Sequence, residues 1–250
     1  MAAAPKIMII AATGSNRDRD VAWACELAGG VPEIVPMNGL IAGAKKLADY
    51  QMLVLPGGFS NGDDLGAGKL WAVTIRHRLG EALAAFVAAK KPVLGICNGF
   101  QALVKSGLLP GDEPATLTRN ERAQFECRWV MVEANPASPC VFTRGLEEPI
   151  FCPVAHGEGQ FVAGDATALA AIEARGGVAL RYAGGGYPHN PNGSVHDIAG
   201  ITNAAGNVLG LMPHPENHIR PEQHPEFHRG VGGRSGLALF RNGIRYAGGL

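Results

Sequence analysis

The sequence predicts an α/β fold, in which a mostly parallel sheet is flanked by helices. One observation supports this prediction, and a second bounds the number of domains. Short apolar runs that suit buried strands alternate along the chain with segments of helical spacing, which is typical of a parallel sheet covered on both faces. The length of 250 residues also lies within the range that one hydrophobic core can fill, so we expect a single domain over residues 1–250.

The individual elements follow from the spacing of apolar residues and helix formers. Apolar runs predict strands at 6–11, 33–37, 51–55, 92–96, 178–182 and 208–212. Helical spacing and composition predict helices at 20–28, 65–89, 100–106, 165–174 and 237–246. The stretch 116–161 alternates differently and predicts antiparallel strands or an excursion from the sheet edge, while 221–236 predicts a surface loop.

Charge and hydropathy argue against two kinds of partner. The 22 basic and 22 acidic residues cancel, and no Lys/Arg run that could follow a phosphate backbone occurs, so no nucleic-acid partner is expected. The longest apolar stretch near the start, 7–12, is too short to span a bilayer and lacks a basic leader. We therefore expect a cytoplasmic protein with no membrane partner.

Cysteines and histidines give no pattern of metal ligands. The five cysteines are scattered and form no CxxC pair, which indicates reduced thiols and no zinc ribbon. Cys127 and Cys152 fall in apolar strand segments, so both are expected in the core. Two i, i+4 spacings, His214/His218 and His224/His228, mimic a metal site on a helix, but the prolines between these residues break any helix. We expect these histidines mostly at the surface, and no metal site.

A GxCxG motif supplies a candidate nucleophile, Cys97. The motif, Gly95-Ile96-Cys97-Asn98-Gly99, joins a predicted strand to a predicted helix, as a nucleophile elbow does, because so tight a turn requires glycine at its flanks. The amino terminus of the following helix favours the thiolate form of a cysteine. A structural cysteine in a glycine turn is the alternative, but strand, glycines and helix in register favour the nucleophile.

The segment Pro213-His214-Pro215-Glu216 supplies a candidate base and its orienting acid. Proline on both sides of His214 excludes an ordinary helix and predicts an extended segment, in which residues two apart point the same way. His214 and Glu216 can then face one site together. A rigid turn with a surface histidine is the alternative, but the segment directly follows a buried strand, and sites in α/β sheets lie at the carboxyl ends of strands.

A cysteine nucleophile with a base is typical of acyl transfer, and this reaction also requires backbone amides that face the developing oxyanion. The amide of Asn98, directly after the nucleophile, is one candidate donor. The second candidate is Gly58, in the glycine turn that follows the preceding strand, one strand–helix unit before Cys97. A Gly-Gly pair after a strand is usually only a turn, so this prediction depends on its place in the chain.

Motifs along nearly the whole chain resemble one known family. They include LPGGFSNGDDLGAGK, VLGICNGFQALVKSGLLPG, PVAHGEGQF, YPHNPNGSVHDIAGITN and GNVLGLMPHPE. The chain is thus similar to the glutaminase subunit of phosphoribosylformylglycinamidine synthase, among the class I triad glutamine amidotransferases. This resemblance implies a Rossmann-like fold and a place in purine biosynthesis.

The resemblance also implies roles for individual residues. Cys97 resembles the family's nucleophile, His214 its base and Glu216 the orienting acid, with Gly58 and Asn98 as oxyanion donors. Gln101 matches a residue that shapes the glutamine pocket. Four further residues are expected near that pocket: Phe59, Ser60, Asn192 and Ser194.

The partners and cofactors follow from the same resemblance. Glutamine is the expected substrate, and a synthetase subunit, with or without a small accessory subunit, is the expected partner. No cofactor is expected in this chain, since ATP and magnesium belong to the synthetase. Two other functions remain open: a cysteine peptidase or esterase, although there the acid would precede the histidine in the chain, and a binding subunit that has lost its chemistry.

Overall fold

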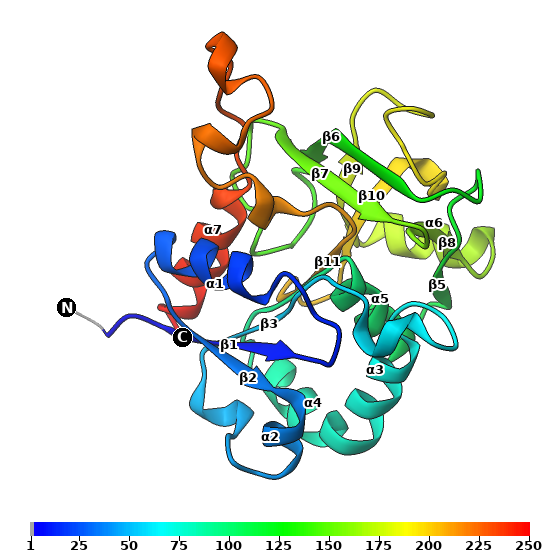
Figure 1. Cartoon of the computed structure of the whole chain (residues 1–250). Coiled ribbons are helices and arrows are strands. Elements are labelled where there is room, and N and C mark those ends of the chain that lie inside the picture. Colours follow the sequence, from blue (N-terminus) through cyan, green and yellow to red (C-terminus); the bar gives the residue numbers. More distant parts are fainter. Residues whose placement is uncertain (1–2) are drawn as a thin grey trace.

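A nine-stranded sheet forms the centre of the molecule (Figure 1). The structure is a computed structural model and describes residues 3–250. The strand order is β2-β1-β3-β4-β11-β10-β9-β6-β7. The parallel strands are β2 (Val31–Pro36), β1 (Lys6–Ala11), β3 (Met52–Leu55), β4 (Val93–Ile96) and β11 (Val208–Leu211). The sheet continues antiparallel through β10 (Ile198–Thr202), β9 (Val178–Tyr182), β6 (Glu126–Ala134) and β7 (Ile150–His156).

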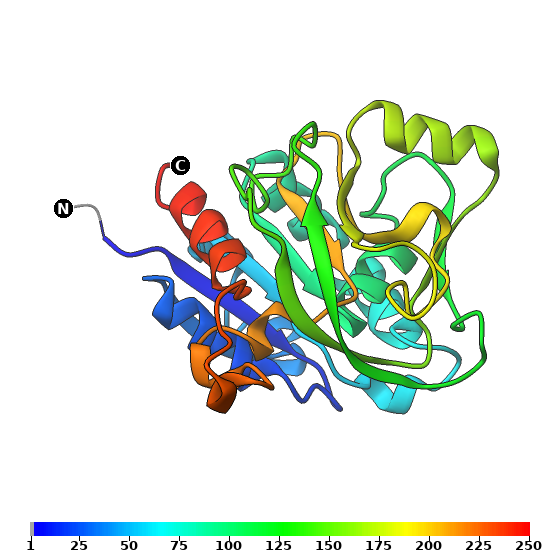
Figure 2. The ribbon, with the colours of Figure 1, turned by 90° about the horizontal axis from the view of Figure 1, so that it is seen from above.

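Helices and a small second sheet surround these strands. The helices are α1 (Asp18–Leu27), α2 (Met37–Ile41), α3 (Lys69–Thr74), α4 (Gly80–Ala88), α5 (Asn98–Lys105), α6 (Ala166–Ala174) and α7 (Leu237–Ala247). A π-helical turn at Ile75–Leu79 joins α3 to α4. Strands β5 (Ala115–Thr118) and β8 (Gln160–Ala163) pair antiparallel. Figure 2 shows α7 beside β1 at one end of the molecule and α6 at the other.

Helices cover both faces of the parallel strands, as β3 illustrates. A Cβ on Gly99 of α5 would lie 2.8 Å from the Cβ of Leu55, whereas a Cβ on Gly243 of α7 would lie 3.4 Å from Cε of Met52. Because Met52 and Leu55 are three residues apart in a strand, their side chains point to opposite faces. The predicted α/β fold with helices on both faces is therefore confirmed.

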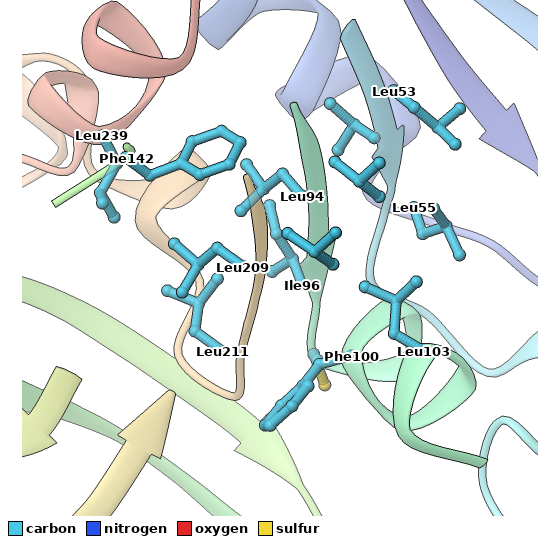
Figure 3. Packing of buried hydrophobic residues seen from close by; sticks show 14 of the residues in the cluster. Leu53, Leu55, Leu94, Ile96, Phe100, Leu103, Phe142, Leu209, Leu211 and Leu239 are labelled. Carbon is cyan, nitrogen blue, oxygen red and sulfur yellow. The ribbon is translucent and has the colours of Figure 1, made fainter. Parts of the chain in front are cut away.

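The core between these layers is continuous across the parallel strands. Side chains of β3, β4 and β11 pack with residues of α5 and α7; Leu53, Leu94, Leu209, Leu103 and Leu239 in Figure 3 are examples. All are buried. Strands buried on both faces appear as unbroken apolar runs in sequence, which is why β3, β4 and β11 could be predicted directly.

The predicted elements are present, and the described residues add an α-helix and a strand that were not predicted. The expected helix 65–89 begins later, at Lys69, and the irregular stretch 116–161 does contain antiparallel strands. Helix α2 and strand β10 were missed. Strand β10 is short and contains Gly200, and its identity as a strand comes from neighbours on both sides, β11 and β9.

The prediction that Cys127 belongs to the core is wrong. Strand β6 alternates, and its buried face carries Glu126, Val130 and Val132, so Cys127 points the other way, toward solvent. Cys152, in β7, is buried as predicted.

The expectation that the four histidines lie mostly at the surface is wrong, because His214, His218 and His224 are buried. His218 and His224 are buried and pack with Trp129 and Phe151, with ring centroids 5.5 Å apart for Trp129–His218 and 5.1 Å for Phe151–His224. Trp129 on β6 and Phe151 on β7, which are distant in sequence from both histidines, cover them. His228 is exposed as expected.

No helix between residues 3 and 250 combines the length and the hydropathy that a bilayer crossing requires.

Candidate active site

Cys97 occupies the turn between β4 and α5 in a strained conformation, with φ = +50° and ψ = −105°. The flanking glycines permit this turn. A Cβ on Gly99 would lie 2.0 Å from the carbonyl oxygen of Leu55, and a Cβ on Gly95 would lie 2.5 Å from Cδ1 of Leu103. Only glycine lets α5 approach β3 and β4 so closely. Cys97 is thus held at the carboxyl end of the parallel strands, as a nucleophile elbow requires.

Strand β11 brings His214 to the same end of the sheet. It pairs parallel to β4 in register Leu211↔Ile96, and the amide of Cys97 donates to the carbonyl of Leu211 at 2.8 Å. The chain therefore leaves β11 beside the elbow. The amide of His214 then donates to the carbonyl of Pro153 in β7 at 2.8 Å, which fixes the backbone of this segment.

His214 and Glu216 are in contact, but their segment is not extended as predicted. Residues Pro215–Asn217 form a 3₁₀ turn, since proline is well suited to the first position of a helical turn. Nδ1 of His214 still lies 2.7 Å from Oε1 of Glu216, so the ring N–H donates to the carboxylate. Both side chains are buried. The Nε2 atom of His214 has no hydrogen-bond partner within the described part of the chain.

The surroundings of His214 favour its charged form. Burial alone would lower the pKa of its imidazole, but the carboxylate of Glu216 and the sulfur of Cys97 outweigh burial and raise the pKa above the ordinary value for histidine. At neutral pH the ring can therefore carry a proton on each nitrogen. Such a group can donate a proton from Nε2 to a leaving group.

A pocket of about 190 Å³ opens onto Cys97. Three of the predicted residues line it with Cys97: Gly58, Phe59 and Gln101. The other lining residues are Asp63, Ala67, Phe125, Ala155, His156, Gly157 and Glu158. The rings of Phe59 and Phe125 are partly exposed and stack with centroids 6.5 Å apart.

The amides of Gly58 and Asn98 are both free of regular backbone pairing. Gly58 and Ser15 form an isolated antiparallel bridge whose hydrogen bonds are made by the residues on either side, Asn16 to Gly57 and Phe59 to Gly14. The amide of Gly58 takes no part in this bridge. Asn98 is the first residue of α5, so its amide has no acceptor within the helix.

The side chain of Asn98 organises one wall of the pocket. Its Oδ1 accepts from the amide of Ser60 at 3.0 Å, and its Nδ2 donates to Oδ1 of Asp63 and Oε1 of Gln101, each at 3.0 Å. The Nε2 atom of Gln101 donates to the carbonyl of Glu158. Gln101 is therefore held rigidly between the elbow helix and the turn after β7.

Three predicted pocket residues lie behind its lining. Ser60 supports the pocket through Asn98. Asn192 and Ser194 are buried and hydrogen-bonded to each other, and Asn192 contacts His156, which does line the pocket. His156 and Glu158 also line the pocket and were not predicted, although both fall in the HGEG motif that supports the family resemblance.

No three His, Cys, Asp or Glu side chains among residues 3–250 are grouped as ligands for a metal ion.

Comparison with known proteins agrees with this geometry. A family model for CobB/CobQ-like glutamine amidotransferase domains matches residues 4–247, so the chain is a glutamine amidotransferase. It is 48% identical over 240 residues to the phosphoribosylformylglycinamidine synthase subunit PurQ of Treponema denticola, covering 86% of this chain and 88% of that protein. The PurQ subunit of Dehalococcoides mccartyi is 41% identical, with 97% of each chain covered. The chain belongs to the PurQ family.

A solved structure supports the same assignment. The chain superimposes on a chain of the PurLQS structure from Thermotoga maritima with a TM-score of 0.76 and 34% identity, over 98% of this chain and 99% of that one.

Proposed function

We propose that this chain is the glutaminase subunit of a phosphoribosylformylglycinamidine synthase, which hydrolyses glutamine to glutamate and ammonia. The observation that carries this proposal is the buried cluster of Cys97, His214 and Glu216 at the carboxyl end of the parallel strands, with a pocket that opens onto the cysteine. Membership of the PurQ family supports the substrate and the pathway, de novo purine biosynthesis.

In the proposed mechanism, Sγ of Cys97 attacks the side-chain amide carbon of glutamine. The oxyanion that forms accepts hydrogen bonds from the amides of Gly58 and Asn98. When the carbon–nitrogen bond breaks, His214 donates its Nε2 proton to the departing ammonia, and a γ-glutamyl thioester remains. His214 then removes a proton from water, which attacks the thioester to release glutamate and restore the cysteine. Glu216 holds the imidazole in place throughout.

The ammonia is consumed by a synthetase subunit, which uses ATP to amidate formylglycinamide ribonucleotide. The PurLQS structure supports such an assembly, because its name describes a complex and the chain that matches this protein is part of it. ATP and magnesium are assigned to the synthetase, with no cofactor in this chain. We place the reaction in the cytoplasm. The proposed complex can also include a small accessory subunit beside the synthetase.

The test is glutamate release from glutamine by the wild type and by Cys97→Ala, each with and without the synthetase, formylglycinamide ribonucleotide and ATP. We expect release that increases with the partner and is abolished in Cys97→Ala, while the melting temperature stays close to that of the wild type. Cys127→Ala is the matched control, because Cys127 is exposed on β6, and it should retain full activity.

Two outcomes would contradict the proposal. A folded wild type that releases no glutamate under any condition would indicate a binding subunit without chemistry. Cys97-dependent cleavage of peptides or esters, without glutamine hydrolysis, would indicate the other class of cysteine hydrolase.

A further inference from the structure

Asn192 lies at the centre of a buried hydrogen-bond network next to the glutamine pocket. Its Oδ1 accepts from the amide of Ser194 at 3.1 Å and from the Ser194 hydroxyl at 2.7 Å. Its Nδ2 donates to the hydroxyl of Tyr182 at 3.0 Å and lies 3.1 Å from Nε2 of His156. Asn192 is fully buried, so its amide makes these contacts without competition from solvent.

This network determines which nitrogen of His156 carries the proton. The backbone amide of Ser194 can only donate, so it requires the oxygen of Asn192 on its side, which leaves the NH₂ group of Asn192 facing His156. Nε2 of His156 must then accept a hydrogen bond, and a neutral imidazole that accepts at Nε2 is protonated at Nδ1. Burial, with a contribution from the charge of His214, lowers the pKa of His156 to about 3, which keeps this ring neutral.

The Nδ1 atom of His156 is buried and has no hydrogen-bond partner within residues 3–250. Buried donors are almost always paired, because an unpaired one is costly. The two nitrogens of an imidazole point in diverging directions, so the Nδ1–H bond points away from Asn192. His156 also lines the pocket that opens onto Cys97. A molecule bound in that pocket is therefore the candidate partner for this donor.

We propose that the Nδ1–H group of His156 donates a hydrogen bond to an oxygen of the bound glutamine, and that Asn192, held by Ser194, is the positioning residue that keeps the proton on that atom. This inference rests on the proposed function, since it assigns a substrate contact in the same pocket. It gives His156 a role distinct from that of His214: one histidine exchanges protons, while the other remains neutral and orients the substrate.

Close packing maintains this arrangement. A Cβ on Gly159 would lie 2.2 Å from Cδ2 of His156 and 2.9 Å from Nδ2 of Asn192, so only glycine fits beside the contact. The side chain of Asn120 donates to the carbonyl of His156 at 2.8 Å and accepts from the amide of Gly159 at 3.0 Å. Gly159 and Asn192 thus confine the ring of His156, and Asn120 fixes its backbone.

Two substitutions of His156 separate the roles of its nitrogens. The amide nitrogen of asparagine can occupy the place of Nδ1, whereas the end of a glutamine side chain reaches the place of Nε2. In the complex with the synthetase, we expect His156→Asn to keep the KM for glutamine within about threefold of the wild type, and His156→Gln to raise it about tenfold or more, with a smaller change in kcat. Equal KM values for the two variants would overturn the inference.

Nitrogen-15 NMR of the histidine-labelled wild type provides a second measurement, which needs no variant to fold. We expect His156 to show a protonated Nδ1 and an unprotonated Nε2, and the Nδ1 signal to shift when glutamine is added to Cys97→Ala. In Asn192→Asp a carboxylate oxygen faces Nε2, so Nε2 should become protonated. An Nε2-protonated tautomer in the wild type would overturn the inference. Cys97-dependent glutamate release would still support the proposed function in that case.

Discussion

At Cys97 the backbone adopts a conformation with positive φ, which is costly for a residue with a side chain. The two neighbouring glycines and the tight contact between α5 and β3 impose it. The strain places the sulfur where the parallel strands end, in reach of a pocket and of His214. The glycine spacing in the sequence was sufficient to predict this residue, because the steric requirement is local. Its role as nucleophile stays a prediction until Cys97→Ala is measured.

The carboxylate of Glu216 favours the charged form of His214 more than any other neighbouring group does, so Glu216→Gln should change the acid–base behaviour of His214. Without the carboxylate, burial is opposed only by the sulfur of Cys97, so the pKa of His214 falls. The wild type should keep its imidazolium until the pH rises through the raised pKa, whereas the variant should lose it at a lower pH. We expect kcat/KM for glutamine to fall by about 100-fold or more at neutral pH, with the alkaline limb of the pH–rate profile displaced to lower pH.

The control for this prediction is Glu222→Gln. Glu222 is exposed and, within residues 3–250, forms an ion pair only with Arg220, so Glu222→Gln should leave the pH–rate profile unchanged. An unchanged profile in Glu216→Gln as well would mean that Glu216 does not set the charge of His214.

At the level of elements, the packing of α5 against β3 determines where the elbow lies. Gly99→Ala would place a methyl group 2.0 Å from the carbonyl oxygen of Leu55, so the helix must move away from the strand. We expect a loss of about 1–3 kcal/mol in the free energy of unfolding. Activity should fall too, because the displaced helix carries the amide of Asn98. Urea denaturation and glutamate release measure the two effects.

Gly80→Ala is the matched control for this helix substitution. Gly80 begins α4, its φ is −52°, and a Cβ there would meet no atom within 4 Å. Alanine should therefore stabilise the protein by about 0.4–1 kcal/mol, since it restricts the unfolded chain. If both variants were equally stable, the close approach of α5 to β3 would not be the constraint described here.

Across the whole molecule, the surroundings of the five cysteines predict different reactivities for their thiols. Burial raises the pKa of Cys25 to about 12 and also raises the pKa of Cys140 and Cys152. Cys127 is exposed, and Cys97 faces the pocket. We expect two thiols to react with Ellman's reagent in the native protein and all five after unfolding, because the thiolate is the reactive form.

Cys127→Ser should leave one reactive thiol in the native protein, and saturating glutamine should slow its reaction. Rapid reaction of four or five thiols without denaturant would contradict the burial described here.

The sequence by itself determined the features whose causes are local. Continuous apolar runs identified the buried strands, glycine spacing identified the elbow at Cys97, and the position of the PHPE segment after a buried strand identified His214 and Glu216. In each case the residue pattern and the conformation are set within a few positions along the chain. The single domain over residues 1–250 stays a prediction.

Only the tertiary structure decided which distant side chains meet. The exposure of Cys127, the burial of His218 and His224, and strand β10 depend on which strands are neighbours. The contact between His156 and Asn192 joins residues 36 apart. Strand register and loop packing bring these atoms together, and neither leaves a periodic signal in the sequence. For this reason the sequence predicts the candidate reacting groups, and the structure alone reveals the hydrogen-bond network that holds the pocket beside them.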